Sequence, residues 1–519
     1  MLICPHCESG EVRKRGTRGE DPVKQIIQCK ACGQYSQHAI QETKSETILR
    51  DPADLKKISS AKVWIISSVQ NNTPLRETFM GALLAFAKQR NAELILARTR
   101  YRNPTNQTEA DREDAESWWP TAAEPYLLEE ELTLTVDTAM MGHVRVGATA
   151  VNPLTGLEPL MKGRHAIFAH AQIAMKTVPA PQYAHPQEMW TTGSASVKNY
   201  SDTKAGVKAE FHHSNGAVIV ERSTQGTFIR GVVADDTGGF YDLDTYYGPG
   251  TATKPGKVKT GQKALALVTG DEHAIFMTDA VKKATYTAPD SLANIVRPLH
   301  RVRHDVLDSY AISHHHRQNT VTRYVKWKTG MDSMEAELQH TADFITETSG
   351  DSINVIVASN HHDHLMRWLN EADPKQEPWN AILYHELMAA VLRAAEMTPS
   401  GAKSIDPFAH WAKDKVPEGT VWLSRNESYP IAGVEVSLHG DRGANGSRGG
   451  IKGFAKLGIR TVIGHSHSSG IEKGCYQVGA SEEELEYSSG PGSWTITHCI
   501  IHPNGKRQLV TLKNGRFRA

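Results

Sequence analysis

The sequence has no excess of charge of either sign, because its 58 lysine and arginine residues are matched by 58 aspartate and glutamate residues. A uniformly basic nucleic-acid coat and an acidic tail are therefore excluded, and any binding of nucleic acid must come from local patches or metal ions. Long apolar runs are missing too: stretches such as 81–87 and 355–358 are far shorter than the ~18 residues of a membrane span. With no apolar signal region at its N-terminus, we expect a soluble, cytoplasmic protein without a membrane partner.

Nucleotide-binding motifs and repeats are also missing. Neither a phosphate-binding GxxxxGK[ST] loop nor a GxGxxG fingerprint occurs, so nothing indicates a nucleotide-driven motor. Internal repeats and low-complexity tracts are absent from the sequence as well. These absences direct attention to residues that bind metals.

Cysteine is scarce, and four of the six cysteines lie within the first 32 residues. Cys4 and Cys7 form one CxxC pair, and Cys29 and Cys32 form a second pair after an interval of 21 residues. This uneven distribution favours a metal site over a disulfide framework, and four thiolates suit a tetrahedral Zn²⁺ ion. We predict one structural zinc ion in a small Cys4 zinc ribbon over residues 1–41, with a redox pair as the alternative.

The segment after the ribbon predicts the start of an α/β domain. Residues 63–69 indicate a buried strand, 74–90 an amphipathic helix and 92–97 a second strand. The Gly- and Pro-rich stretch 248–256 is typical of a domain boundary. We therefore divide the chain into a ribbon (1–41), a linker (42–60), an N-terminal α/β domain (61–255) and a catalytic domain (256–519).

In the catalytic domain, residue types that bind metals recur directly after apolar, strand-like segments. Because open α/β sheets build their sites at the carboxyl ends of strands, we expect these clusters to meet. The clusters are Asp271 and His273 after 264–270, Asp305 and Asp308 after 296–303, Asn360 and His361 after 354–358, His439 after 434–438, and His465 and His467 after 461–464.

The order of these clusters resembles the signature of the calcineurin-like metallophosphoesterase superfamily: DxH, GDxxD, GNH(D/E), a lone His and GHxH. Two positions depart from it, because His304 and Ser359 stand where the second and third motifs have glycine. Both are positions of backbone geometry and not of metal coordination. The resemblance implies the four-layer αββα sandwich of that superfamily.

The resemblance also implies a site for two metal ions that share Asp305. Mixed oxygen and imidazole ligands favour Mn²⁺, with Fe or Zn as alternatives. Asp271, His273, Asp305 and His467 are expected to hold the first ion, and Asp305, Asn360, His439 and His465 the second.

Two further residues receive catalytic roles from the same resemblance. His361 is expected to protonate or stabilise the leaving alkoxide, and Asp308 to orient a ligand or His361. Two ions held together can clamp a phosphodiester and activate a water molecule.

Other residues keep two interpretations. His314, His315 and His316 form either a solvated turn or part of a substrate groove, and neither His362 nor His364 is expected to be a ligand. The glycine-rich loop 440–450 is either a flexible surface loop or a phosphate-binding loop in which Arg442 and Arg448 contact DNA.

The substrate class is not fixed by the metal ligands alone. The zinc ribbon and the additional α/β domain favour DNA, as in the SbcD-type nucleases of the superfamily. The whole arrangement also resembles the pre-early nucleases of T-five-like tailed phages, which implies a phage-encoded enzyme that degrades host DNA in the host cytoplasm early in infection. We also expect a homo-oligomer.

Two other functions are compatible with the sequence. One is a phosphatase or small-molecule phosphodiesterase whose zinc ribbon binds another protein. The other is a DNA-binding or assembly protein whose metal site is structural.

Overall fold

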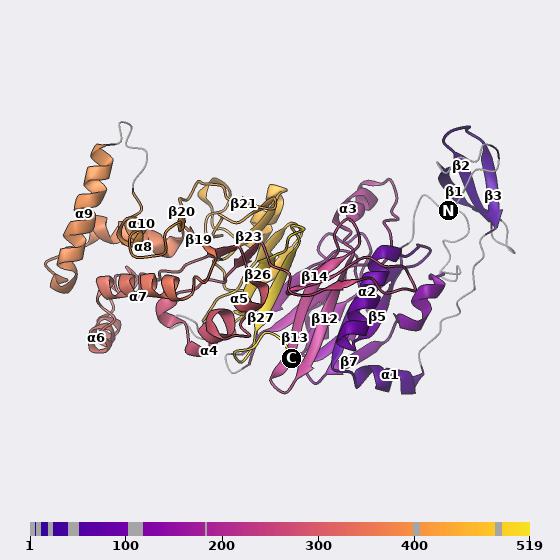
Figure 1. Ribbon diagram of the computed structural model, residues 1–519, viewed down its shortest axis with the longest axis horizontal. Helices are drawn as coiled ribbons and strands as arrows, with labels where there is room; N and C mark the ends of the chain where they lie inside the picture. Colours follow the sequence, from indigo (N-terminus) through magenta and orange to yellow (C-terminus); the bar gives the residue numbers. More distant parts are fainter. Residues whose placement is uncertain are drawn as a thin grey trace.

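The computed structural model describes His6 and residues 12–18, 24–39, 51–101, 118–181, 184–397, 405–482 and 490–519. Figure 1 shows an elongated arrangement in which sheets are flanked by helices.

The protein is of the α/β class, which confirms the predicted class. The four-layer sandwich of the metallophosphoesterase superfamily stays a prediction. None of the described helices is both long and apolar enough to cross a membrane.

The N-terminal residues that are described form a three-stranded antiparallel sheet of β1 (Val12–Arg18), β2 (Lys24–Cys29) and β3 (Tyr35–Ala39). Cys29 ends β2 and is buried, and Cys32 lies exposed in the turn that follows. Cys4 and Cys7 lie outside the described residues, so the zinc site stays a prediction.

A helix occupies the second part of the predicted linker. Helix α1 (Pro52–Ser59) begins after Asp51, whose side chain accepts a hydrogen bond from the backbone N–H of Ala53. Ile58 in this helix is buried and belongs to the main hydrophobic cluster. Residues 52–59 are therefore packed against the body of the protein and are no free linker.

The predicted strand–helix–strand unit is confirmed as β4 (Val63–Gln70), α2 (Glu77–Arg90) and β5 (Glu93–Thr99). They belong to a five-stranded sheet in the order β13-β12-β4-β5-β6. Every residue of β4 is buried, including the polar residues Ser67, Ser68 and Gln70, as expected for a strand covered on both faces. The other strands are β6 (Leu127–Leu128), β12 (Gly216–Ser223) and β13 (Gly226–Val233).

A second sheet of six strands has the order β20-β19-β18-β17-β26-β27. Its last strand, β27, lies beside β13, so the two sheets adjoin (Figure 1). The strands are β17 (Ala266–Val268), β18 (His300–Arg303), β19 (Ile353–Val357), β20 (Val421–Leu423), β26 (Ile496–Ile501) and β27 (Arg507–Leu512).

A third sheet of ten strands combines residues from both sides of the predicted boundary at 255/256, in the order β21-β22-β23-β25-β24-β10-β11-β9-β8-β7. Its strands are β7 (Glu131–Thr135), β8 (Thr138–Met141), β9 (His165–Phe168), β10 (Met175–Val178), β11 (Gln187–Thr191), β21 (Pro430–Ile431), β22 (Val434–Glu435), β23 (Arg460–Ile463), β24 (Gly470–Glu472) and β25 (Cys475–Gln477).

One hydrophobic cluster joins the three sheets. It contains Ile66 of β4, Val268 of β17 and Val462 of β23, so the ten-stranded sheet packs against the other two. The neighbours Ile65 and Leu267 point to the opposite face, where helices cover the sheets, as the two-residue period of strands requires. Segments 61–255 and 256–519 therefore share a core.

The stretch 248–256 contacts helix α2, although most of its residues are exposed. The backbone N–H of Gly256 donates a hydrogen bond to the carbonyl of Gly81 in α2. A Cβ on Gly81 would lie 2.3 Å from the Cα of Gly250, so glycine is required where these backbones meet. The glycines predicted to form a linker serve this close contact.

The two segments repeat one topology, although their sequences show no repeat. In the first, the hairpin β12–β13 pairs antiparallel with β4, which continues in parallel to β5 and β6. In the second, the hairpin β26–β27 pairs antiparallel with β17, which continues in parallel to β18 and β19.

The ten-stranded sheet shows the same correspondence. Strands β8, β9 and β11 are parallel and β11 pairs antiparallel with β10, just as β22, β23 and β25 are parallel and β25 pairs antiparallel with β24. The two halves meet where β10 and β24 pair antiparallel. We call residues 61–255 the first half and residues 256–519 the second half.

Helices cover the outer faces, and most of those in the second half pack on the six-stranded sheet. Beyond α1 and α2, the helices are α3 (Lys204–His212), α4 (Asp279–Lys282), α5 (Leu292–Val296), α6 (Thr320–Thr329), α7 (Met334–Glu347), α8 (Asn360–Glu371), α9 (Ala381–Glu396), α10 (Pro407–Ala412) and α11 (Ile451–Phe454).

Candidate metal centre

Three parallel strands of the six-stranded sheet position the first group of predicted ligands. Strands β17, β18 and β19 run in the same direction, so their carboxyl ends lie at one edge. Asp271 and His273 follow β17, and Asp305 follows β18. Asn360 begins α8 directly after β19, where the side chain of Ser359 caps the helix. The strand ends meet as predicted.

The ten-stranded sheet supplies the remaining ligands. His439 follows β22, and His465 and His467 follow the parallel strand β23. Gly464 lies so close to Asp271 that a Cβ at this position would meet the Oδ1 atom at 2.3 Å. A glycine is therefore needed where the second sheet approaches the first.

Asp305 lies at the centre of the cluster. Its Oδ2 atom is 3.1 Å from the Nε2 atom of His439 and 3.9 Å from the Nε2 atom of His273. The same Nε2 atom of His439 lies 3.1 Å from the Oδ1 atom of Asn360. One carboxylate thus adjoins residues predicted to hold both ions.

Asp271 forms a second centre. Its Oδ2 atom lies 3.1 Å from the Nε2 atom of His467, and its Oδ1 atom lies 4.0 Å from the Nδ1 atom of His439. The His465 ring lies 5.3 Å from the His439 ring. All seven predicted ligands therefore converge, while their coordination of ions stays a prediction.

Several ligand atoms in this cluster are buried without a hydrogen-bond partner among the described residues. They include Oδ1 of Asp271, Oδ1 of Asp305 and Nε2 of His273. Leaving a buried polar atom unpaired costs about 1–3 kcal/mol, and more for a charged group. Carboxylate and imidazole groups that converge in this way suit divalent transition metals. The residues present therefore fit the two ions that the sequence predicts.

Four of the predicted ligands have a strained backbone. The φ angles are 37° at His273, 44° at Asp305, 74° at His465 and 57° at His467, all in the left-handed region that favours glycine. Such conformations cost on the order of 1–3 kcal/mol each and concentrate at functional sites. The fold maintains this strain at the positions where the ligands converge.

The electrostatics of the cluster keep its two central carboxyl groups ionised. Burial opposes ionisation of Asp271, but His439 and His467 outweigh it and bring its pKa to about 2. Burial likewise opposes ionisation of Asp305, and His439 and His361 hold its pKa well below the ordinary value. Both carboxylates are therefore negative at neutral pH, as metal ligands must be.

The structure brings the two predicted catalytic residues to the side of the cluster. Asp308 Oδ2 lies 2.5 Å from His273 Nδ1 and 3.5 Å from His361 Nδ1. His361 Nδ1 also lies 2.8 Å from the backbone carbonyl oxygen of Asp308. The His361 ring is partly exposed, whereas His273 is buried. His361 is thus placed between the ligands and solvent, and both roles stay predictions.

Glu482 is a member of the cluster that the sequence interpretation missed. One carboxyl oxygen lies 3.8 Å from His273 Nε2, and neither oxygen has a hydrogen-bond partner among the described residues. Burial raises the pKa of Glu482 to about 8, although His273 acts in the opposite direction. Its position shortly after the apolar strand β25, at the same sheet edge, was the available signal.

His304 was interpreted only as a replacement for glycine, yet its side chain lies inside the cluster. Its Nδ1 atom is 3.4 Å from the Nδ1 atom of His439, and it groups with Asp271 and His439 as possible ligands. Burial, followed by the neighbouring His439, lowers its pKa to about 4. The ring is therefore neutral, the form that binds metals.

The loop 440–450 is anchored by an ion pair. The side chains of Arg442 and Asp363 contact one another, and Arg425 pairs with Asp363 at 2.8 Å and with Asp441 at 2.7 Å. Arg442 and Arg448 are both exposed. Both interpretations of the loop therefore remain, although Arg442 already has an anionic partner.

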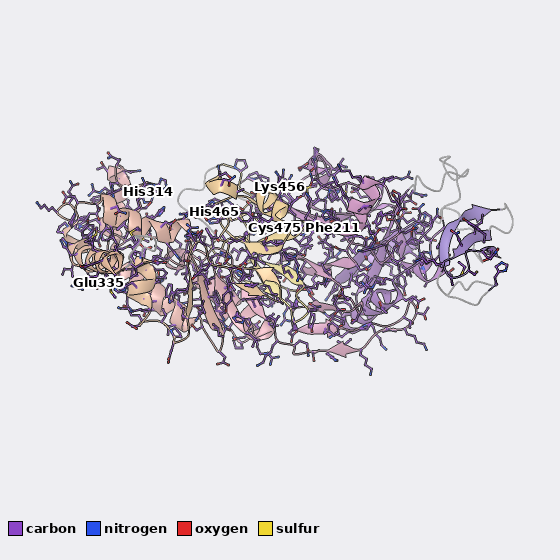
Figure 2. All side chains as sticks on the ribbon, turned by 90° about the horizontal axis from the view of Figure 1, so that it is seen from above. Phe211, His314, Glu335, Lys456, His465 and Cys475 are labelled. Carbon is purple, nitrogen blue, oxygen red and sulfur yellow. The ribbon has the colours of Figure 1, made fainter. Side chains whose placement is uncertain are left out.

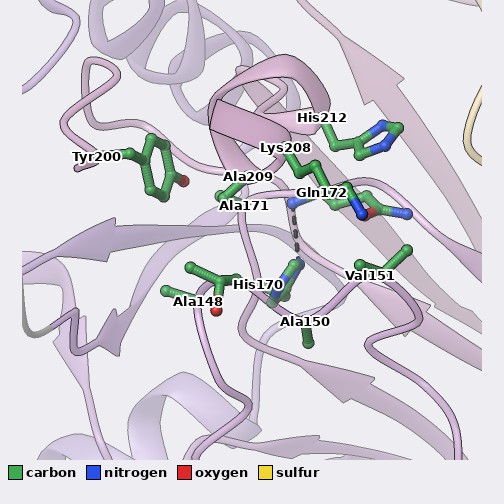
Figure 3. A pocket seen from close by; sticks show the side chains of 11 residues that line it. Ala148, Ala150, Val151, His170, Ala171, Gln172, Tyr200, Lys208, Ala209 and His212 are labelled. Atoms are coloured by element: carbon green, nitrogen blue, oxygen red, sulfur yellow. Dashed lines mark hydrogen bonds between the residues drawn. The ribbon is translucent and has the colours of Figure 1, made fainter. Parts of the chain in front are cut away.

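The equivalent sheet edge in the first half carries different side chains. The loop after β9 contains His170 and Gln172 where the loop after β23 contains His465 and His467. His170 Nδ1 accepts a hydrogen bond from the backbone N–H of Gln172 at 3.0 Å (Figure 3). The Nε2 atom lies 3.2 Å from the carbonyl oxygen of Gly147. Both ring nitrogens of His170 therefore have hydrogen-bond partners within the protein.

A small pocket lies beside His170 (Figure 3). Among the described residues, the groups of three side chains that could hold a metal ion all lie in the second half. Figure 2 shows His465 lying between His314, a member of one of these groups, and the first-half residue Phe211 along the long axis. The side chains that line the pocket include Tyr200, Lys208 and His212.

Fold and site together define an α/β protein with a buried histidine–aspartate cluster that can hold metal ions. The chain belongs to the same family as Protein A1 of Escherichia phage T5, with 33% identity over 477 residues that span 89% of this chain and 84% of Protein A1. No family model and no solved structure matches the chain. The expected relation to a protein of a T-five-like phage is confirmed, and it fits a phage origin. Membership of the calcineurin-like metallophosphoesterase superfamily stays a prediction.

Proposed function

We propose that the protein is a metal-dependent DNA nuclease that hydrolyses phosphodiester bonds with a metal-activated water molecule. The main support is the convergence of Asp271, His273, Asp305, His439 and His467 from two sheets. Their unpaired ligand atoms and strained backbone are features of a functional site and serve no purpose in a hydrophobic core.

The chain's own residues account for metal binding and for the orientation of the ligands. Bound divalent cations, with Mn²⁺ proposed and Fe or Zn as alternatives, would supply an activated water and neutralise charge on the phosphate. Asp305 places one negative charge between the two sets of ligands, which offsets the repulsion between two cations. Asp308 fixes the ring of His273 through its Nδ1 atom, so that Nε2 faces the ligands.

His361 is proposed to assist the leaving group. Its Nδ1–H donates to the carbonyl of Asp308, which leaves Nε2 as the atom available to substrate. The carboxylate of Asp308 lies 3.5 Å from Nδ1, and we propose that Nε2 donates a proton to a departing alkoxide. The partial exposure of the ring gives a substrate access to this atom.

DNA is proposed as the substrate on two grounds. The relation to a protein of phage T5 supports the predicted phage origin, and the two CxxC pairs resemble the zinc ribbons of DNA-handling proteins. Degradation of host DNA in the host cytoplasm is the role we propose for such an activity.

A homo-oligomer is also proposed. Helices α6 and α9 present large apolar residues to solvent, among them Trp327, which is 63% exposed, and Ile382, which is 73% exposed. Exposed apolar groups of this kind are typical of contact surfaces between protein chains. Light scattering of the purified protein measures the number of copies directly.

A comparison of substrates tests the proposed function. Metal-stripped protein, with and without added Mn²⁺, is incubated with linear duplex DNA, with a bis-nitrophenyl phosphate diester and with nitrophenyl phosphate. The proposal expects Mn²⁺-dependent cleavage of DNA. Turnover of the small esters without cleavage of any DNA would favour the phosphatase alternative, and DNA binding without hydrolysis would favour a structural metal site.

A further inference from the structure

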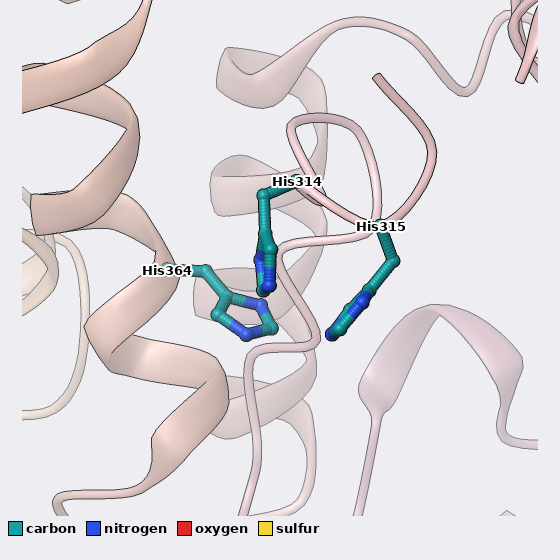
Figure 4. A group of neighbouring side chains, drawn as sticks. All are labelled: His314, His315 and His364. Carbon is teal, nitrogen blue, oxygen red and sulfur yellow. The ribbon is translucent and has the colours of Figure 1, made fainter. Parts of the chain in front are cut away.

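A second cluster of histidines lies beside the candidate metal centre. His314 and His315 come from the loop before α6, and His364 lies in the second turn of α8 (Figure 4). One ring nitrogen from each of these residues lies within 4.8 Å of the other two. Figure 4 shows the three side chains extending toward a common space from a loop and a helix that are separate in sequence.

The packing of these rings leaves metal-binding atoms without partners. The ring centroids of His314 and His364 are 4.9 Å apart, and those of His314 and His315 are 3.8 Å apart. The Nδ1 atoms of His314 and His364 are buried and have no hydrogen-bond partner among the described residues. Two buried imidazole nitrogens beside a third ring are costly unless a cation or water binds them.

Burial favours the neutral form of two of the three rings, those of His314 and His364. Burial, followed by His361 and His314, lowers the pKa of His364 to about 3. Burial, followed by His315, also lowers the pKa of His314. Neutral imidazoles present lone pairs and are ligands for zinc and other transition metals.

Two arginines and one glutamate lie near the cluster. Arg317 and Arg367 both pair with Glu371, with N–O distances of 3.4 Å and 2.9 Å. The one carboxylate compensates one of the two positive charges, so a cation on the histidines would have to be held by the imidazole nitrogens and not by the local charge.

We propose that His314, His315 and His364 form a third cation site that takes one Zn²⁺-type ion and is distinct from the centre around Asp305. Three histidines leave at least one coordination position for water or another oxygen ligand, as in open zinc sites. This assignment departs from the sequence interpretation, in which the three histidines carried no ligand role.

The location suggests what the open position binds. The His361 ring lies 4.6 Å from the His273 ring on one side and 5.2 Å from the His364 ring on the other. An ion held by His364 would thus lie across His361 from the candidate metal centre. If the proposed nuclease function holds, on which this step rests, the ion would hold a neighbouring phosphate of the same DNA strand.

Metal counting tests the site without any assay of activity. The full-length protein is stripped of metal, dialysed against buffered Zn²⁺ and analysed for bound zinc. His314→Ala and His364→Ala should each bind one zinc ion fewer than the wild type. The exposed His385 on α9 provides the matched control, because His385→Ala should bind as much zinc as the wild type.

A combined variant separates this site from the proposed catalytic one. Asp305→Asn should lose zinc while keeping the ion on the three histidines, and Asp305→Asn with His364→Ala should lose both contributions. If His314→Ala and His364→Ala bind as much zinc as the wild type, the third site does not exist, whatever the protein does to DNA. If zinc binds as expected but DNA is not cleaved, only the nuclease proposal fails.

Discussion

The two halves of the protein have the same strand order but different chemistry at the equivalent sheet edge. In the second half, the strand ends carry aspartate and histidine side chains with unpaired, buried ligand atoms. In the first half, β4 is followed by Asn71 and Asn72, and β9 is followed by His170, whose ring nitrogens are bonded to the backbone. A shared topology therefore positions residues but does not determine what they do.

The comparison also shows how each half uses its buried polar groups. The first half buries Arg230 against Glu221 and Asp242, at 2.8 Å and 2.5 Å, so that opposite charges compensate each other. The second half buries Arg303 against Glu272 in the same way, at 3.1 Å. Its Asp271 and Asp305, by contrast, lie among histidines, and each has a carboxylate oxygen without a hydrogen-bond partner among the described residues. Both halves therefore contain a stabilising buried ion pair, and the histidine–aspartate cluster of the second half is the part that we assign to function.

The largest effect is expected for Asp305→Asn in the second half. Removing the shared negative charge destabilises the binding of two cations close together, and the activated water is lost with them. We predict a fall in Mn²⁺-dependent DNA hydrolysis of about 10³-fold or more, a barrier increase of several kcal/mol. Rates of cleavage of a labelled duplex measure this effect, with circular dichroism as the check on folding. If this variant kept the wild-type activity, the catalytic centre would lie elsewhere in the protein.

His361→Ala should reduce the rate without removing the metals. A positioned proton donor contributes ~10²–10⁴-fold, so hydrolysis should fall by that factor while bound manganese and DNA affinity stay unchanged. Parallel measurements of single-turnover rate, metal content and DNA binding check this combination. Loss of bound metal in this variant would show that His361 is a ligand and not a proton donor.

Arg230→Leu should destabilise the first half. Removing one partner of a buried ion pair costs about 3–5 kcal/mol, because Glu221 and Asp242 remain buried and uncompensated. Urea unfolding measures this loss. The matched control is Arg164→Ala, which breaks a partly exposed pair with Glu131 and should cost no more than about 1 kcal/mol. Equal losses in both variants would contradict the stabilising role of the buried pair.

The same ion pair predicts a pH dependence. Burial opposes ionisation of Glu221, but Arg230 outweighs it and brings the pKa from 4.5 to about 2. Because the folded pKa is the lower one, the stabilisation is present above pH 4.5 and is lost as the pH falls toward 2. Stability of the wild type should therefore decrease over this range more steeply than that of Arg230→Leu. Parallel pH profiles would contradict this linkage.

The smallest effect is expected at the equivalent histidine of the first half. His170→Ala should leave Mn²⁺-dependent DNA hydrolysis within about twofold of the wild type, whereas His465→Ala should impair it strongly, because only His465 lies among the converging ligands. Rates measured side by side compare the two positions. If His170→Ala were as inactive as His465→Ala, both halves would carry catalytic residues.

Local patterns in the sequence predicted much of the site. The apolar run of β4 and the helix α2 are continuous in sequence, so their periodicity is visible without tertiary contacts. Asp305 and His439 were predicted because each directly follows a strand and belongs to an ordered motif. In the structure, atoms of these two residues lie 3.1 Å apart.

Features that depend on contacts between distant segments were not predicted. The pairing of β10 with β24 joins residues almost 300 positions apart in the chain, and no local pattern encodes it. Glu482 belongs to no motif, and only the fold brings it beside His273. The repeated topology was missed because it is maintained by apolar patterning, which many different sequences satisfy.

Anomalous scattering from crystals that contain manganese locates the bound ions themselves. We predict two manganese peaks that flank the carboxylate of Asp305 in the second half, and none in the first-half pocket beside His170. Both peaks should disappear or weaken in crystals of Asp305→Asn. Manganese bound beside His170, or none near Asp305, would contradict the assignment of metal chemistry to the second half.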